Sequence, residues 1–556
     1  MYRRPGRMKR CVRARRSAIL AFATGVLACE LALATDPRAT VEQGVIEGVR
    51  EQSLDVYRGV PFAAPPVGGL RWRAPQPAAG WNGVRPAKSF ASPCVQASPT
   101  VADEARRSIV GSEDCLYLNV WTGVARASGH QPVMVWIHGG GMTGGTADSP
   151  LTTGEVLARR GVVLVSISYR LGPFGFLAHP QLRAESARQV SGNYGLLDMI
   201  AALEWIHRNV AAFGGDPHQV TIFGESAGAH AVSMLCASPL ARGLFARAIS
   251  ESGGSFAPPR PAGPPGESMR LLADAERAGI LLAGNAGARS IAELRRMPAD
   301  RIMAAASDHG PFWPVVDGWA IPAEQYSLYA EGHYNDVPVL IGYNSDEGAS
   351  FASGMTAVEY AAGVRRRYGP FAERLLAAYP AGSATVVARS GRDLIRDAWY
   401  GWHTWTWARL QSRKGTGKVF LYFFDRHPQD AGVPAPIDSG APHGLEIPYV
   451  FGHLGTVRGS SPDASARGIS EAMIRYWTNF ARNGDPNGDG VPNWPPFREL
   501  HPVMMHIDQE AHAGAPVDVA GLTVLDEYYA WRRSAQGARA AQIDDAPPAS
   551  TQASGR

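Results

Sequence analysis

A serine between two glycines is the first group in this sequence with the pattern of a nucleophile. Residues 224–228 read G-E-S-A-G, the form G-x-S-x-G that places a serine hydroxyl on a sharp turn between a strand and a helix. Apolar residues 220–223 predict the strand, and residues 229–235 predict the helix. The glycines permit close backbone approach and a strained turn. We therefore predict that Ser226 is a nucleophile.

A serine hydroxyl barely ionises at neutral pH, so it needs a base and an acid that orients the base. The reaction also needs donors for the oxyanion that develops on an attacked carbonyl. Residues 138–141 read H-G-G-G directly after an apolar run. Such a loop, with the residue after the nucleophile, supplies the backbone N–H groups of an oxyanion hole. We expect these donors to be Gly140, Gly141 and Ala227.

The elements around these motifs alternate between strand and helix patterns. Apolar β-rich runs predict strands at 132–137, 162–167, 220–223, 337–341 and 419–424. A longer helical pattern covers residues 196–210. This alternation predicts an α/β fold with a mostly parallel central sheet flanked by helices.

The charge of the chain does not support a basic nucleic-acid surface. The formal net charge of the 556 residues is +4, but 46 of the 54 Lys and Arg residues and 49 of the 50 Asp and Glu residues lie after residue 34. The chain without its first 34 residues is therefore slightly acidic. We expect no nucleic acid as partner, and the sequence leaves the oligomeric state open.

The first 34 residues have the pattern of an export signal. Eight basic side chains precede an apolar run at 17–28, and A-L-A at 32–34 offers a cleavage site. We expect a secreted or periplasmic protein, with lipoprotein anchoring at Cys29 and a twin-arginine route as alternatives. No later stretch has 18 uninterrupted apolar residues, so we expect no membrane span. We expect one catalytic domain over 35–535 and a disordered tail over 536–556, which is rich in Ala, Gln, Pro and Ser.

Three cysteines remain after the leader. An oxidising compartment permits one bridge among Cys94, Cys115 and Cys236. Cys236 lies in an apolar helical pattern, where a free cysteine is usually a small core residue. We expect a Cys94–Cys115 disulfide, which would stabilise the fold by roughly 3 kcal/mol on the chain-entropy estimate.

Long motifs make the sequence similar to the type-B carboxylesterases, the α/β-hydrolase family that includes cholinesterases and bacterial para-nitrobenzyl esterases. They include Y-R-G-V-P-F-A at 57–63, E-D-C-L-Y-L-N-V-W at 113–121 and Y-R-L-G-P-F-G-F at 169–176. G-N-Y-G-L-L-D at 192–198 and F-G-G-D-P at 213–217 continue the match. The resemblance covers nearly the whole chain after the leader and implies an α/β-hydrolase fold.

The resemblance also assigns the base and the acid. The family's acid lies in a D-E-G motif, here 346–348, which implies Glu347. The family's histidine lies in H-G-x-E, here 443–446, which implies His443. Chain order alone leaves seven histidines after Glu347 as candidates. The expected enzyme is therefore a serine carboxylesterase with a Ser226–His443–Glu347 triad and no cofactor.

The sequence departs from the acetylcholinesterases at one informative position. Their choline-binding Trp is Ala105 here, so we expect neutral short-chain or aromatic esters rather than choline esters. Residues 485–490 begin like a calcium loop, but Pro496 stands where a bidentate Glu is needed, and we expect no metal. A lipase acting on long-chain esters and a non-catalytic adhesion module of the same fold remain alternatives.

Overall fold

The computed structural model describes most of the chain. The described residues are 36–98, 108–123, 130–261, 267–306, 312–352, 354–427, 439–456 and 461–544. The predicted export signal at 1–34 and the position of Ala105 lie outside them. Within the described residues, no helix is long and apolar enough to cross a membrane.

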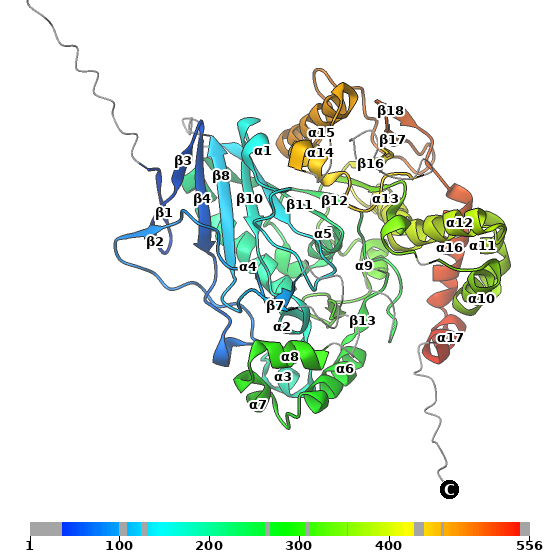
Figure 1. Cartoon of the computed structure of the whole chain (residues 1–556), viewed down its shortest axis with the longest axis horizontal. Coiled ribbons are helices and arrows are strands. Elements are labelled where there is room, and N and C mark those ends of the chain that lie inside the picture. Colours follow the sequence, from blue (N-terminus) through cyan, green and yellow to red (C-terminus); the bar gives the residue numbers. More distant parts are fainter. Residues whose placement is uncertain are drawn as a thin grey trace, which may run out of the picture. The chain divides into compact units, whose positions relative to one another are not determined.

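Eleven of the described strands form one central sheet. Figure 1 shows β3 near one edge of this sheet and β18 near the other. Its middle strands, from β10 to β17, run parallel, and antiparallel strands extend both edges. This confirms the predicted mostly parallel sheet. In spatial order the strands are β18 (Ala511–Gly514), β17 (Met504–Ile507), β16 (Val419–Phe424), β15 (Val339–Asn344), β12 (Arg247–Glu251), β11 (Gly215–Glu225), β9 (Gln131–Ile137), β10 (Val163–Ile167), β8 (Tyr117–Gly123), β4 (Leu54–Pro61) and β3 (Val49–Glu51).

The strands are apolar on both faces because helices cover both sides of the sheet. Along β9, Val133, Val135 and Ile137 belong to one hydrophobic cluster, whereas Met134 and Trp136 belong to the other. Successive side chains of a strand point to opposite faces, so the two clusters are the two layers of core on either side of the sheet.

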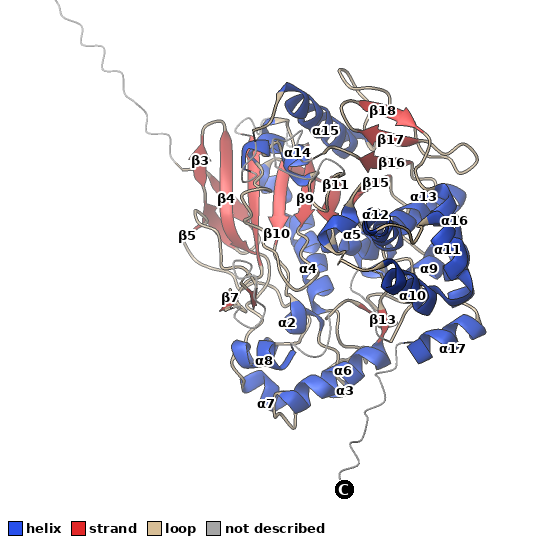
Figure 2. Ribbon diagram, turned by 45° about the vertical axis from the view of Figure 1, so that its right-hand side comes forward, coloured by secondary structure: helices blue, strands red, loops and turns tan. Residues whose placement is uncertain are grey.

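Different helices supply the two layers. On the side of Val133 the core includes residues of α4 (Tyr194–Asn209), α5 (Ala227–Ala237) and α13 (Trp402–Lys414). On the side of Trp136 it includes residues of α1 (Glu155–Arg159), α14 (Ile447–Phe451) and α15 (Ala464–Asn483). Figure 2 shows these helices, in blue, around the red strands.

Further helices pack beyond the sheet. One group, which lies together in both Figure 1 and Figure 2, comprises α10 (Ala357–Tyr368), α11 (Ala372–Ala378), α12 (Ala384–Arg396), α16 (Val519–Arg532) and α17 (Ala535–Asp544). The others are α2 (Gly172–Phe176), α3 (Pro180–Glu185), α6 (Leu272–Asn285), α7 (Ile291–Arg296), α8 (Ala299–Ala306) and α9 (Gln325–Glu331). Small sheets pair β1 (Arg38–Val41), β2 (Gly44–Glu47) and β5 (Val84–Pro86), β6 (Gln96–Ala97) with β7 (Ile109–Val110), and β13 (Arg270–Leu271) with β14 (Val315–Val316).

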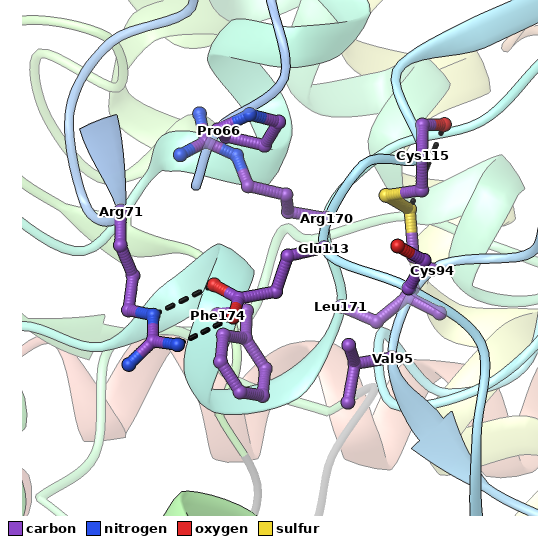
Figure 3. A pocket seen from close by; sticks show the side chains of 10 residues that line it. Pro66, Arg71, Cys94, Val95, Glu113, Cys115, Arg170, Leu171 and Phe174 are labelled. Atoms are coloured by element: carbon purple, nitrogen blue, oxygen red, sulfur yellow. Dashed lines mark hydrogen bonds and ion pairs between the residues drawn. A yellow bond between two sulfur atoms is a disulfide. The ribbon is translucent and has the colours of Figure 1, made fainter. Parts of the chain in front are cut away.

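A disulfide links Cys94 to Cys115, and Cys236 is buried and free within α5. Figure 3 shows the bridge beside the ion pair between Arg71 and Glu113, both lining a small cavity of about 10 Å³. Arg71 also donates to the carbonyl oxygens of Leu294 and Met297, at 2.9 and 2.8 Å. The segment held by the bridge is thereby attached to the C-terminal end of α7 and to Met297, the residue that follows it.

The structure corrects one expectation about the C-terminal segment. Residues 536–544, expected to belong to a disordered tail, continue the helix α17. The sequence A-Q-G-A-R-A-A-Q-I-D contains mostly residues with good helix propensity, and this outweighs the polar composition on which the expectation rested. Residues 545–556 lie outside the described part.

Candidate active site

Ser226 occupies the turn between β11 and α5, as the pattern predicts. Its backbone φ is 56° and its ψ is −123°, a conformation that is strained for a residue with a side chain. The amide of Ser226 donates to the carbonyl of Glu251 at 2.9 Å, and its carbonyl accepts from the amide of His230 at 2.9 Å. These backbone bonds hold the turn in place.

The two glycines of the motif serve close packing rather than a special dihedral. A Cβ atom on Gly228 would lie 2.0 Å from the carbonyl oxygen of Ile137, and one on Gly224 would lie 2.6 Å from the same oxygen. Neither glycine has a positive φ. The strained dihedral belongs to Ser226 itself. The two glycines therefore allow the close backbone approach that was predicted, but they do not themselves adopt a strained conformation.

The predicted triad residues lie within hydrogen-bonding distance of one another. The Oγ of Ser226 is 2.8 Å from Nε2 of His443, and Nδ1 of His443 is 2.5 Å from Oε2 of Glu347. His443 lies in the loop before α14, and Glu347 begins the helical turn Glu347–Ser350 after β15. The Glu347 side chain is fully buried, whereas 13% of the His443 side chain is exposed. Glu347 therefore orients Nδ1 of the imidazole, and Nε2 faces the hydroxyl of Ser226.

Two further donors fix the carboxylate of Glu347. Its Oε1 accepts from the amide of Asn344 at 2.7 Å and from the hydroxyl of Ser252 at 2.5 Å. Ser252 follows β12 and has a positive φ of 60°, which turns its side chain toward β15. Ser252 was not predicted from the sequence, because a single serine after a strand has no pattern that marks it as functional.

The glycine loop after β9 lies against Ser226. A Cβ atom on Gly139 would be 3.1 Å from the Cβ of Ser226. Gly140 and Gly141 have φ values of 104° and 64°, which L side chains rarely adopt. The amides of Gly140, Gly141 and Ala227 donate to no acceptor within the described residues. Three unpaired N–H groups near a serine hydroxyl are what an oxyanion requires.

Buried carboxylates surround His443. Oε1 of Glu225 is 3.2 Å from its Nε2, and Glu446 lies three residues further along its own loop. Burial lowers the pKa of His443, but the charges of Glu225 and Glu347 outweigh this and raise the pKa above its usual value. Burial also raises the pKa of Glu225 and Glu446. Glu225 belongs to the G-x-S-x-G motif and Glu446 to the H-G-x-E motif. The positions of these motifs in the sequence do not indicate how close either carboxylate lies to the imidazole.

Aromatic rings complete the surroundings of the imidazole. The ring centroids of Phe351 and Tyr400 lie 5.2 and 4.9 Å from that of His443. Tyr400 is buried and Phe351 is partly exposed. In the part of the chain that the structure describes, no group of His, Cys, Asp or Glu is arranged to hold a metal ion.

Comparison with known proteins gives consistent results. The model of the carboxylesterase family matches residues 35–520. A fumonisin B1 esterase from Sphingopyxis macrogoltabida is 36% identical over 518 residues, which cover 87% of this chain and 89% of that protein. The para-nitrobenzyl esterase of Bacillus subtilis is 33% identical, with 85% and 94% covered. The solved structure of a PNB esterase is similar with a TM-score of 0.77 at 31% identity, covering 88% of this chain and 99% of that one.

Proposed function

Since the chain belongs to the carboxylesterase family and is a serine carboxylesterase with the α/β-hydrolase fold, we propose that Ser226, His443 and Glu347 catalyse its ester hydrolysis. The observation that carries this proposal is the continuous path from the Ser226 hydroxyl through the imidazole to a buried carboxylate, with contacts of 2.8 and 2.5 Å. Such a path is the geometry by which a weak nucleophile is activated.

In the first step His443 takes the proton of Ser226 while Oγ attacks the ester carbonyl. Glu347 keeps the imidazole in the tautomer whose Nε2 accepts this proton, and it stabilises the imidazolium that forms. The carbonyl oxygen becomes an oxyanion that accepts hydrogen bonds from the amides of Gly140, Gly141 and Ala227. The N-terminus of α5, where Ala227 lies, adds a favourable partial positive charge.

In the second half of the reaction the tetrahedral intermediate collapses. His443 donates its proton to the leaving alcohol, and the acyl group stays on Oγ of Ser226. Water then attacks the acyl-enzyme with His443 again as base, releasing the carboxylic acid and restoring the serine. No step uses a cofactor.

The proposed substrates are neutral short-chain or aromatic esters. One relative supports the aromatic part of this proposal, since it is a para-nitrobenzyl esterase. The argument against choline esters rests on Ala105, which lies outside the described residues. A panel of p-nitrophenyl esters of increasing chain length, beside emulsified triglycerides, separates this proposal from lipase activity.

We also propose that residues 1–34 direct export to the periplasm or the medium. The support is the basic, then apolar, then A-L-A pattern of the sequence. Cell fractionation followed by mass measurement should find exported protein that begins at residue 35. Full-length protein retained inside the cell would contradict the proposal.

Replacing the nucleophile tests the mechanism. Ser226→Ala should lower kcat by about 10⁶-fold, because the triad acts as a unit. A sulfonyl fluoride should label the wild-type protein once, at Ser226. Ser233→Ala is the matched control, since Ser233 lies on the same helix with its hydroxyl bonded to the carbonyl of His230. Ester turnover by Ser226→Ala at the wild-type rate would rule the mechanism out.

A further inference from the structure

The glycine loop, residues 138–145, has a backbone conformation that its own sequence does not impose. Gly140, Gly141 and Gly145 have φ values of 104°, 64° and 107°, and Met142 has a φ of 58° although it carries a side chain. Glycine is free to adopt many other conformations, and a positive φ is unfavourable for methionine. Such a backbone persists only where surrounding contacts hold it. The amides proposed as oxyanion donors therefore depend on contacts that fix this loop.

Gln96 contacts the end of the glycine loop through both groups of its amide. Its Oε1 accepts from the amide of Gly145 at 2.9 Å, and its Nε2 donates to the carbonyl of the same residue at 2.9 Å. Nε2 also donates to the carbonyl of Cys94 at 3.1 Å. Only 6% of Gln96 is exposed. A side-chain amide has the same donor and acceptor as a peptide group, so Gln96 pairs with Gly145 as a neighbouring strand would.

Gly145 connects this restraint to the beginning of the glycine loop. A Cβ atom on Gly145 would be 2.3 Å from Nδ1 of His138 and 2.4 Å from the carbonyl oxygen of Gly139. The two ends of the loop are therefore in direct contact. The amide of Gly144 donates to the carbonyl of Gly140 at 2.9 Å. A displacement of Gly145 would move Gly144 and, through this hydrogen bond, the backbone at Gly140.

The backbone at Gln96 is itself attached to the central sheet. Gln96 begins β6, which pairs with β7. The disulfide, which Figure 3 shows, links the nearby Cys94 to Cys115, just before β8 of the central sheet. The amide of Gln96 therefore extends from a segment that is fixed on the sheet.

Two other contacts hold different parts of the glycine loop. The hydroxyl of Tyr169 donates to the carbonyl of His138 at 2.8 Å. The amide of Gly172 donates to the carbonyl of Met142 at 2.7 Å. Neither bond involves the end of the loop. Without Gln96, the start of the loop would therefore keep its position while its end would be released.

We propose that Gln96 is a positioning residue for the ester hydrolysis, which keeps the amides of Gly140 and Gly141 directed at the oxyanion by holding Gly145. The proposal rests on the function proposed above and adds one residue to the groups that perform it. Gln96 acts through the glycine loop, whose amides interact most strongly with the charge that develops in the transition state. Loss of its amide should therefore lower kcat and leave KM nearly unchanged.

The variant Gln96→Met tests this directly, because methionine has a similar length and no amide. Its kcat per active site should fall by about tenfold to 100-fold, since a displacement of about 1 Å costs about 100-fold. Its KM should stay within about twofold of the wild-type value. The substrate is a neutral p-nitrophenyl ester, and labelling of Ser226 by a sulfonyl fluoride, run to completion, counts the active sites.

Gln411→Met is the matched control. Gln411 is also buried, and its amide donates to the carbonyls of Val337 and Gly417. It accepts from Nε1 of Trp407, so each glutamine makes three hydrogen bonds. Val337 and Gly417 precede β15 and β16, whereas Glu347 follows β15, so Gln411 lies at the far end of these strands from the triad. Both variants should have a lower melting temperature, but kcat of Gln411→Met should equal that of the wild type.

An inhibitor that forms an oxyanion gives a second readout. Oγ of Ser226 adds to the carbonyl carbon of an alkyl trifluoromethyl ketone, His443 takes the hydroxyl proton, and the ketone oxygen becomes an oxyanion. The inhibition constant should rise in Gln96→Met by about the factor by which kcat/KM falls, and it should not change in Gln411→Met. If Gln96→Met does not fold, Gln96→Asn decides the same comparisons, because its amide is one methylene too short to pair with both groups of Gly145.

Three results would overturn the proposal. The first is a wild-type kcat in Gln96→Met with a lower melting temperature, which would give Gln96 a role in stability alone. The second is an equal fall of kcat in Gln411→Met. The third is a fall of kcat in Gln96→Met with an unchanged inhibition constant. Ester turnover by Ser226→Ala at the wild-type rate would instead contradict the proposed function, so the two failures are distinguishable.

Discussion

The imidazole of His443 titrates under the influence of a carboxylate of the proposed triad and of a carboxylate outside it. Glu225 lies 3.2 Å from Nε2, on the side of the nucleophile, whereas Glu347 holds Nδ1 on the opposite side. A negative charge at either position favours the imidazolium. Because only the neutral imidazole can accept the proton of Ser226, these carboxylates also set the pH range in which the enzyme works.

Glu225→Gln should therefore shift the pH profile. Removing this carboxylate removes one of the effects that raise the pKa of His443, so that pKa falls. The acidic limb of kcat/KM should move to lower pH, by about one unit, the usual order for a close charge. The profile is measured with a neutral p-nitrophenyl ester. An unchanged or higher apparent pKa in the variant would contradict this assignment.

Glu251 should affect stability rather than turnover. Burial raises its pKa to about 8, and Trp477 donates to its Oε1 at 2.7 Å. A group whose pKa is higher in the folded state than in the unfolded state stabilises the fold at low pH. For Glu251 this stabilisation is lost as the pH rises from 4.5, the pKa in the unfolded state, toward about 8, the pKa in the folded state.

The variant Glu251→Gln keeps the acceptor for Trp477 and cannot ionise. Its melting temperature relative to wild type should rise between pH about 5 and about 8, with a gain of about 1–3 kcal/mol in unfolding free energy over that window. Thermal unfolding across this range checks it. A difference between the two proteins that does not vary with pH would show that Glu251 is not the titrating group.

At the scale of elements, the turn at Ser226 depends on how closely β11, α5 and β9 approach one another. Gly228 lies in the first turn of α5 directly against the end of β9, where a Cβ would be 2.0 Å from the carbonyl oxygen of Ile137. The same strand end leads into the glycine loop beside Ser226. Any separation of α5 from β9 therefore moves the nucleophile away from the proposed oxyanion donors.

Gly228→Ala should for this reason impair both folding and catalysis. Overpacking should cost about 1–3 kcal/mol or more, and a displacement of about 1 Å should lower kcat by about 100-fold. Gly284→Ala in α6 is the matched control, since a Cβ there meets no atom within 4 Å and alanine favours a helix. Melting temperature and kcat are compared for both. Wild-type behaviour of Gly228→Ala would mean that the packing at this turn is looser than described.

At the scale of the whole molecule, we expect substrate charge to distinguish this protein from cholinesterases. The absence of an aromatic residue at position 105 removes a cation–π attraction of about 0.5–2 kcal/mol. Acetylthiocholine should therefore be hydrolysed no faster, in kcat/KM, than a neutral thioester of matching size. The comparison is made at fixed ionic strength because salt screens charge effects. A preference of about tenfold or more for the cation would show that another group binds it.

Features formed by residues that are close together in the chain could be predicted from the sequence. The strands predicted at 132–137 and 419–424 correspond to β9 and β16, and the nucleophile turn and the glycine loop follow strands where expected. Such features depend on the periodicity of apolar side chains and on glycines within a few residues. A short stretch of sequence is therefore enough to predict them. The family resemblance was needed to assign Glu347 as the acid and His443 as the base, because chain order alone left seven histidines as candidates for the base.

Only the tertiary structure showed what surrounds those residues. Ser252 reaches Glu347 across 95 positions of sequence, and Trp477 donates to Glu251 across 226 positions. It also showed that α17 extends into the expected tail. These contacts depend on the order of strands in the sheet and on how helices pack over it. They form between segments distant in the chain, and the local pattern of neither segment specifies its partner.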